Sequence, residues 1–202
     1  MRNSKVYFRI IKHITMKKIL LAVLLGISVS SYSQALKPTL KKGTVLTYVV
    51  IADGQETPIN ISVDSITNDF LRFNWNMEGL GTGKWIVHKA SLEKAERAYW
   101  DDLLPNNDVE IPEGQSIVMF SKAQWASFQK DKKLNFDQQT FTAKKATGDQ
   151  IIKVNGKEID AIYLEGENGT TRLWIANNAK TPFLVKISGN TIGPDVELRS
   201  IK

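Results

Sequence analysis

The chain contains no cysteine among its 202 residues and has only two histidines. The absence of cysteine excludes disulfides, thiolate metal sites and cysteine nucleophiles. One histidine, His13, lies in the predicted targeting segment, so His88 is the single histidine of the predicted mature chain. A metal site with several histidines is therefore excluded, and so is the two-histidine helix of zinc proteases.

Acidic residues are absent from the first 33 residues, whereas six of the 27 basic residues lie there. Subtracting these six leaves 21 basic residues against 21 acidic ones, so the formal charge of +6 belongs to the N-terminal segment. A mature chain with balanced charge lacks the basic footprint of a nucleic-acid-binding protein. We predict no nucleic-acid partner.

Long apolar runs are also scarce, and the longest extends from Ile19 to Val29 after Lys17-Lys18. This run is shorter than the roughly 20 apolar residues that cross a bilayer, and its length is typical of a signal-peptide core. We therefore predict a signal peptide over residues 1–33, in which Met1–Thr15 is either an upstream extension or a long n-region. The mature chain should be periplasmic or extracellular and should have no transmembrane anchor.

The predicted cleavage site is set by small residues. Ser31 and Ser33 suit cleavage before Gln34, and cleavage after Ala35 is the alternative. The remaining length is enough for one hydrophobic core and short for two. We predict a leader over residues 34–42 and a single β-rich domain over residues 43–202.

The first part of this domain has the period of β-strands. The stretch before the Asp53-Gly54 turn is dense in β-branched residues and apolar on both faces, and after the turn β-branched and aromatic residues alternate with polar ones. The predicted strands are Thr44–Ala52, Ile59–Val63, Leu71–Met77 and Lys84–His88. Strands in succession with one apolar face favour an antiparallel meander.

The middle of the chain changes to a helical period. Residues 91–99 predict a helix with Ser91 as its N-cap. A short strand over Ser116–Phe120 precedes Ser121-Lys122-Ala123-Gln124, which has the spacing of a capping box. Trp125 and Phe128 would form the buried face of this second helix.

Strand patterns resume from Gln150. An Asn155-Gly156 pair between apolar runs is a strong signal for a hairpin, and Asn168-Gly169 marks another turn. The predicted strands are Ile151–Val154, Glu158–Leu164, Thr171–Ala176, Phe183–Ile187 and Val196–Ile201. Strands, two helices and strands again predict an α+β fold: one strongly curved antiparallel sheet, a half-barrel, with two helices on its concave face.

The C-terminal strands carry a resemblance. Arg172–Ile175, Thr181–Lys186 and Glu197-Leu198 resemble the last strands of uncharacterised exported Gram-negative envelope proteins. Those proteins are similar in fold to the half-barrels of the lipoprotein-carrier and lipoprotein-localisation group. The resemblance implies a curved sheet and a helical lid around an apolar pocket, and it supplies no catalytic motif.

Catalytic and metal-binding patterns are weak. As a general base, His88 would need a partner such as Ser91 or Asp101, and a lone histidine at a strand end is more often a surface residue. The oxygen-rich loop from Asp101 to Glu110 lacks the alternating ligand spacing of an EF-hand. We predict no catalytic residue, no metal and no cofactor.

Large aromatic residues give the remaining indication of function. The candidates for lining a ligand are Phe73, Trp75, Trp85, Trp125 and Trp174, although their spacing is equally that of core residues. We predict a non-catalytic exported binding protein of the cell envelope that holds a hydrophobic or lipidated ligand against the sheet. The alternative is an envelope interaction or assembly factor with a filled core, which binds a protein and no small ligand.

Overall fold

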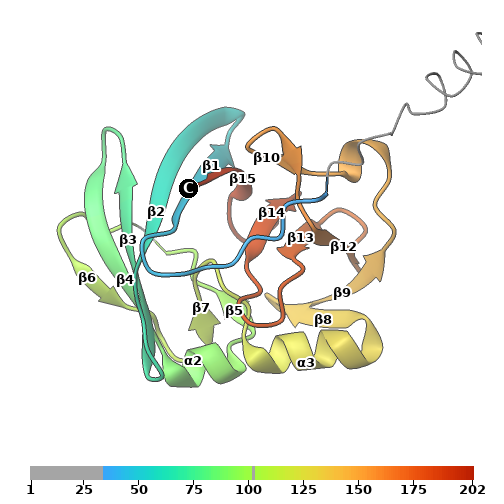
Figure 1. Ribbon diagram of the computed structural model, residues 1–202, viewed down its shortest axis with the longest axis horizontal. Helices are drawn as coiled ribbons and strands as arrows, with labels where there is room; N and C mark the ends of the chain where they lie inside the picture. Colours follow the sequence, from blue (N-terminus) through green and yellow to red (C-terminus); the bar gives the residue numbers. More distant parts are fainter. Residues whose placement is uncertain (1–33, 102) are drawn as a thin grey trace, which may run out of the picture. The chain divides into compact units, whose positions relative to one another are not determined.

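The first half of the sheet forms where β-branched and aromatic residues are dense, on both faces of the first strand and in alternation with polar residues in the next two. In the computed structural model, which describes residues 34–101 and 103–202, this pattern gives antiparallel strands joined by short turns (Figure 1). They are β1 (Val45–Ala52), β2 (Gln55–Ile66), β3 (Phe70–Met77) and β4 (Gly81–His88). Each strand pairs with the next. The predicted strands of this region are confirmed, and the second is longer than predicted.

The second half of the sheet follows the helices. Its strands are β8 (Lys133–Phe136), β9 (Gln139–Lys144), β12 (Ala161–Gly166), β13 (Arg172–Ala176), β14 (Leu184–Ser188) and β15 (Asp195–Ile201). Neighbouring strands pair antiparallel. The last three predicted strands are confirmed to within a residue at each end, whereas the β8–β9 hairpin is not among the predicted elements.

Pairing between β1 and β15 joins the two halves into one sheet. The 11 strands have the order β6-β4-β3-β2-β1-β15-β14-β13-β12-β9-β8, so β6 (Asp108–Glu110) and β8 are its edges and the sheet is open. β6 runs parallel to β4 because the intervening chain passes through a helix and is long enough for a crossover. The prediction of a wholly antiparallel sheet is wrong at this edge. The prediction of a mostly β fold with two helices and one large sheet is confirmed.

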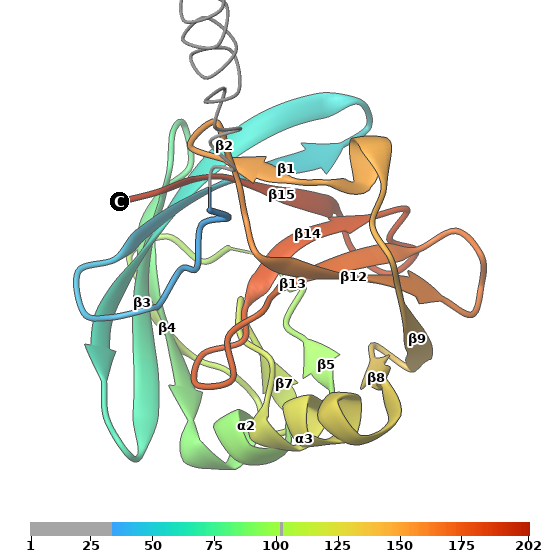
Figure 2. The ribbon, with the colours of Figure 1, turned by 45° about the vertical axis from the view of Figure 1, so that its right-hand side comes forward.

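Two α-helices occur in the described part of the chain, α2 (Lys89–Lys94) and α3 (Lys122–Asp131). They contact each other and lie together at one end of the domain, beneath the strands in Figures 1 and 2. α3 begins at Ser121, whose hydroxyl accepts a hydrogen bond from Gln124 N while its own backbone N–H donates to Gln124 Oε1. The predicted capping box is therefore confirmed. The burial of Trp125 and Phe128 on α3 also agrees with the prediction.

The first predicted helix is wrong in its second half. α2 ends at Lys94, and Ser91 lies inside it, buried, instead of forming the N-cap. After Ala95 the chain becomes extended and forms β5 (Arg97–Ala98), which pairs in parallel with β7 (Gln115–Ser116). The backbone N–H groups of this segment donate to distant acceptors, as in Tyr99 N to Ser116 O at 2.8 Å. Tertiary hydrogen bonds have outweighed the local helical period.

The predicted strand over residues 116–120 is also mostly irregular. Only its first residue belongs to β7, and Met119 makes an isolated bridge to Phe183. Val118 has a φ of 65°, a left-handed conformation that a β-branched residue rarely adopts and that interrupts extended backbone. The predicted hairpin at Asn155-Gly156 is confirmed, because both residues have positive φ between β10 (Lys153–Val154) and β11 (Lys157–Glu158).

The predicted leader packs against the domain. Leu36 forms a bridge with Ile159, and Leu40 is buried in the core. Residues Ala35–Lys202 form one compact unit. The predicted signal peptide lies outside the described residues, and within residues 34–101 and 103–202 no helix has the length and apolarity needed to cross a membrane.

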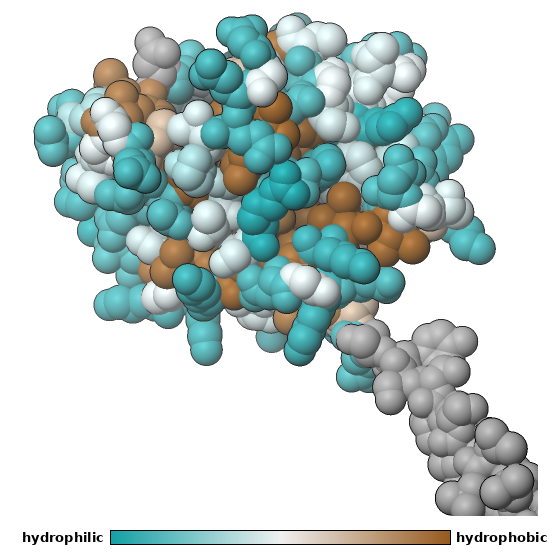
Figure 3. Space-filling model, turned by 90° about the horizontal axis from the view of Figure 1, so that it is seen from above, coloured by the Kyte–Doolittle hydropathy of each residue, from teal (hydrophilic) through white to brown (hydrophobic). Residues whose placement is uncertain are grey.

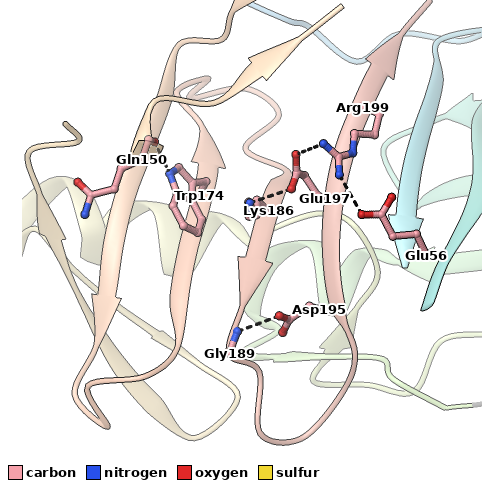
Figure 4. A network of polar contacts seen from close by, with 8 residues as sticks. All are labelled: Glu56, Gln150, Trp174, Lys186, Gly189, Asp195, Glu197 and Arg199. Atoms are coloured by element: carbon pink, nitrogen blue, oxygen red, sulfur yellow. Dashed lines mark hydrogen bonds and ion pairs between the residues drawn. The ribbon is translucent and has the colours of Figure 1, made fainter. Parts of the chain in front are cut away.

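A polar network links the two halves of the sheet (Figure 4). Glu197 on β15 accepts a hydrogen bond from Lys186 on β14 at 2.8 Å and forms an ion pair with Arg199 at 2.7 Å. Arg199 also reaches Glu56 on β2 at 3.5 Å, and the Lys186 ammonium lies 5.5 Å from the ring centre of Trp174 on β13. Since the Glu197 side chain is only 12 % exposed, solvent screens its ion pairs with Lys186 and Arg199 only weakly. The network therefore connects β2 with β13–β15 through side chains.

The capping box of α3 gives a first prediction. We expect Ser121→Ala to lower the free energy of unfolding by about 1 kcal/mol, because it removes the acceptor for Gln124 N at a buried N-cap. Urea denaturation measures this change.

Ser127→Ala is the matched control, since Ser127 is exposed in the middle of the same helix. Alanine has the higher helix propensity, so this substitution should be neutral or slightly stabilising. Equal effects of the two substitutions would contradict the assigned cap.

Candidate binding cavity

A cavity of about 170 Å³ lies between the sheet and the segment that covers it. The sheet contributes residues of β1 to β4, β14 and β15, among them Tyr48, Val50 and Trp85. The covering segment contributes residues from 98–103 and 116–120, including Tyr99 and Met119. Both halves of the sheet therefore border the same space.

Strand periodicity explains which residues face the cavity. On β1, Tyr48 and Val50 share one face because side chains alternate between the two faces of a strand. Ile59 on β2 is the cross-strand partner of Tyr48 and lies on the same face. Val196 on β15 pairs with Val50 from the other side. Apolar residues on the inner faces of β1, β2 and β15 thus produce a continuous apolar wall.

The lining is almost wholly apolar. Asp101 is its single charged residue, and it is exposed. Tyr48 is buried, and its hydroxyl donates a hydrogen bond to Leu184 O at 2.5 Å. Burial holds the pKa of Tyr48 above its usual range, so this hydroxyl stays neutral. The wall therefore favours uncharged, apolar ligand atoms.

Two residues of the wall carry buried polar atoms without a partner. Within the described residues, neither Trp85 Nε1 nor Ser116 Oγ has a hydrogen-bond partner. The ring centre of Trp75 lies 5.8 Å from that of Trp85, and the indole N–H of Trp75 also has no hydrogen-bond partner among the described residues. Unpaired buried donors are rare in proteins because each loses its hydrogen bond to water. Of the unpaired atoms among the described residues, Trp85 Nε1 and Ser116 Oγ belong to residues of the cavity wall, whereas Trp75 lines the depression over Asn60 and Asn74.

The covering segment is held by one carboxylate. Asp137, at the turn between β8 and β9, accepts hydrogen bonds from Ala98 N and from Trp100 Nε1, both at 2.8 Å. Its own backbone N–H donates to Glu96 O at 2.9 Å. Asp137 is only 6 % exposed, and this burial raises the pKa of its carboxyl. The hydrogen bonds from Trp100 and Ala98 and the positive charge of Arg97 each lower the pKa, but their effect is smaller than that of burial.

The aromatic candidates from the sequence occupy different places. Of the five, Trp85 lines the cavity. Phe73 is fully buried in the core, and Trp75 packs over Gly83, where a Cβ would lie 2.7 Å from the indole. Trp125 packs against Phe128 beneath the second half of the sheet. Trp174 stacks on Tyr163 and donates to Gln150 O at 2.8 Å.

Most lining residues are not among the candidates predicted from the sequence. Tyr48 lies within a predicted strand and lines the cavity. The one feature of the sequence that could have indicated this role is its hydroxyl group among apolar neighbours. Tyr99, Ile117 and Met119 lie in segments whose backbone is irregular or only briefly paired, and no period in the sequence indicates where they point. Long-range packing places them.

His88 lies away from the cavity lining. It is exposed at the end of β4, where its Nε2 contacts Glu110 Oε2. Ser91, one of its predicted partners, instead donates to Pro112 O at 3.4 Å. In the described residues, no group of three or more acidic or histidine side chains is arranged to hold a metal ion.

Two wider surface depressions have mixed linings in which polar residues outnumber apolar ones. One, of about 500 Å³, lies beside Arg97 and the β8–β9 turn, and the other, of about 540 Å³, lies over Asn60 and Asn74 on the outer face of the first half of the sheet. On the face drawn in Figure 3, apolar side chains form several groups among hydrophilic ones. The cavity of about 170 Å³ has an almost wholly apolar wall and is less open to solvent than either depression, so it is the strongest candidate site.

Asp137 predicts a pH dependence. Its folded pKa lies above the ordinary value of about 3.9, so the folded state binds more protons than the unfolded state between those two pKa values. Stability associated with Asp137 should therefore fall as pH rises through this window. We expect the free energy of unfolding of the wild type, relative to Asp137→Asn, to decrease from pH 4 upward and then level off. Urea titrations at several pH values measure this difference, and a constant or rising difference would contradict the assignment.

Comparisons of the chain with protein-family models, with curated proteins and with solved structures find no match. The resemblance carried by the C-terminal strands therefore stays a prediction. The cavity and its covering segment are the observations from which a function can be argued.

Proposed function

We propose that this chain is a non-catalytic, exported binding protein of the cell envelope that holds a hydrophobic ligand in the cavity between the sheet and residues 98–120. The observation that carries this proposal is the apolar cavity of about 170 Å³. A preformed apolar space with polar groups in its wall is the usual form of a small-molecule site.

Export is supported by the sequence. Lys17-Lys18 and the apolar run Ile19–Val29 have the composition of a signal peptide. The absence of cysteine after this run leaves no residue for thioether lipid attachment. We propose that the mature chain functions in the periplasm or outside the cell.

We also propose that the sheet and its cover act as a half-barrel of the lipoprotein-carrier type. The support is that strands from both halves of the sheet, including β1, β4 and β14, border one cavity. The covering segment closes that cavity from one side and is anchored through Asp137. In this arrangement, the sheet provides the apolar wall and the cover controls access.

The alternative, an interaction factor with a filled core, has less support. A partner strand would pair most easily with a long, exposed edge, but the edge strands β6 and β8 contain only 3 and 4 residues. The cavity also departs from a filled core. The position of His88 outside the cavity lining supports a non-catalytic role.

Val50→Phe tests the binding function. Val50 lines the cavity, and the larger ring should fill it, so we expect the affinity for benzene to fall at least about tenfold, or about 1.4 kcal/mol. Ligand-observed NMR measures this affinity.

Val49→Phe is the matched control, because Val49 is the adjacent residue on the opposite face of β1 and is not part of the lining. This control should leave the affinity within about twofold of the wild-type value. Saturable binding that survives Val50→Phe, or no binding to the wild type, would refute the proposed site.

A further inference from the structure

The end of the predicted signal peptide decides which residue carries the amino terminus of the mature chain. Cleavage before Gln34 leaves a glutamine there, whereas cleavage after Ala35 leaves Leu36. Gln34 is exposed and immediately precedes the compact unit that begins at Ala35. Leu36 forms a bridge with Ile159, and its backbone N–H donates to Glu158 O at 2.7 Å. A charged ammonium group on Leu36 would lose water within this pairing, so the contacts favour cleavage before Gln34.

The leader that follows Gln34 is part of the folded domain. Pro38 and Leu40 are buried, and Asn178 Nδ2 donates a hydrogen bond to Pro38 O at 2.8 Å. Together with the bridge of Leu36, these contacts hold the leader against the domain. An aminopeptidase acting on a free amino terminus at Gln34 would reach them after removing only the first two residues of the mature chain. A blocked amino terminus would therefore protect contacts of the domain.

An amino-terminal glutamine can block itself. An α-amino group has a pKa of about 7.7–8.0, so at neutral pH a fraction of it is unprotonated and nucleophilic. Its nitrogen attacks the side-chain amide carbon Cδ of the same residue, and the new C–N bond closes a five-membered lactam. The bond from Cδ to the side-chain nitrogen breaks, and this nitrogen leaves as ammonia with the proton that the amine gives up.

The surroundings of Gln34 permit this reaction. Its side chain is exposed, and within residues 34–101 and 103–202 it has no hydrogen-bond or ion-pair partner. The side-chain amide is therefore free to approach an amino group on the same residue. The reaction is intramolecular, so it needs no oxidant, reductant or second substrate.

We propose that the mature chain begins at Gln34 and that this residue is modified to pyroglutamate, a neutral amino-terminal lactam. The modification depends on the proposed export and is independent of the proposed ligand cavity. Cyclisation removes the positive charge of the amino terminus and the free amine that aminopeptidases recognise. The leader then keeps its contacts with Ile159 and Asn178 while the protein is outside the cytoplasm.

Mass spectrometry of the exported protein tests the modification. The full chain is expressed in a Gram-negative host, purified from the periplasm or the medium, and sampled over several days at neutral pH. We expect the predominant species to have the mass of residues 34–202 less one ammonia. Fragmentation of the amino-terminal peptide should place this loss on Gln34.

Gln34→Asn is the matched control. Asparagine keeps the side-chain amide but is one methylene shorter, so the corresponding lactam would be a strained four-membered ring and does not form. Because Gln34 is exposed and outside the packed part of the leader, the variant should fold as the wild type does. Its amine should stay free, so an added aminopeptidase should remove its first residue, whereas the cyclised wild type should keep an intact amino terminus.

The outcomes separate the modification from export. If the mature chain begins at Gln34 but stays uncyclised, or loses its first residue to the aminopeptidase as fast as Gln34→Asn does, the modification is wrong while export stands. If the mature chain begins at Leu36 or at any other residue, both the cleavage site and the modification are wrong. If residues 1–33 stay attached and the protein stays in the cytoplasm, export is wrong as well. Benzene binding tests the cavity separately, because Gln34 is not part of its lining.

Discussion

The pairing of β1 with β15 is the constraint on which the rest of the structure depends. It joins strands more than 140 residues apart in the chain, and reciprocal hydrogen bonds between Val45 and Lys202, both at 2.9 Å, close its end. Without this pairing, β1–β4 and β12–β15 would be separate sheets, each with an exposed apolar face. Closing so long a loop has an entropic cost that grows slowly with length, whereas the apolar area buried on both sides of the junction is large.

The cavity is a consequence of this junction. Tyr48 and Val50 on β1 lie between Ile59 of the first half and Val196 of the second half, and the Tyr48 hydroxyl bonds to Leu184 across the boundary. The two halves of the sheet meet at the β1–β15 pair, and a covering segment is needed to keep water away from the apolar side chains there. The irregular segment fixed by Asp137 supplies that cover without filling the space completely. The polar network around Glu197 stabilises the same junction independently of the cavity.

Local signals in the sequence predicted the elements whose cause is local. A dense run of β-branched residues predicted β1, and alternation predicted β2 and β3. Asn155-Gly156 predicted a hairpin, and Ser121 with Gln124 predicted the start of α3. Elements that depend on distant partners were not predictable in this way. The chain leaves the helix after Ala95 because Asp137 and β7 bind its backbone, and the cavity lining at Met119 is set by a bridge to Phe183. Trp85 was predictable as an aromatic strand residue, but its unpaired N–H follows only from its three-dimensional surroundings.

The junction of the two halves leaves an apolar space between the sheet and the segment that covers it. A crystal of the protein under xenon pressure tests this most directly, because xenon enters dry apolar cavities of this size without requiring any particular hydrogen bond. We expect a single strong xenon site bordered by Tyr48, Trp85 and Leu184. Side chains that fill this region, with xenon absent from it, would contradict the account.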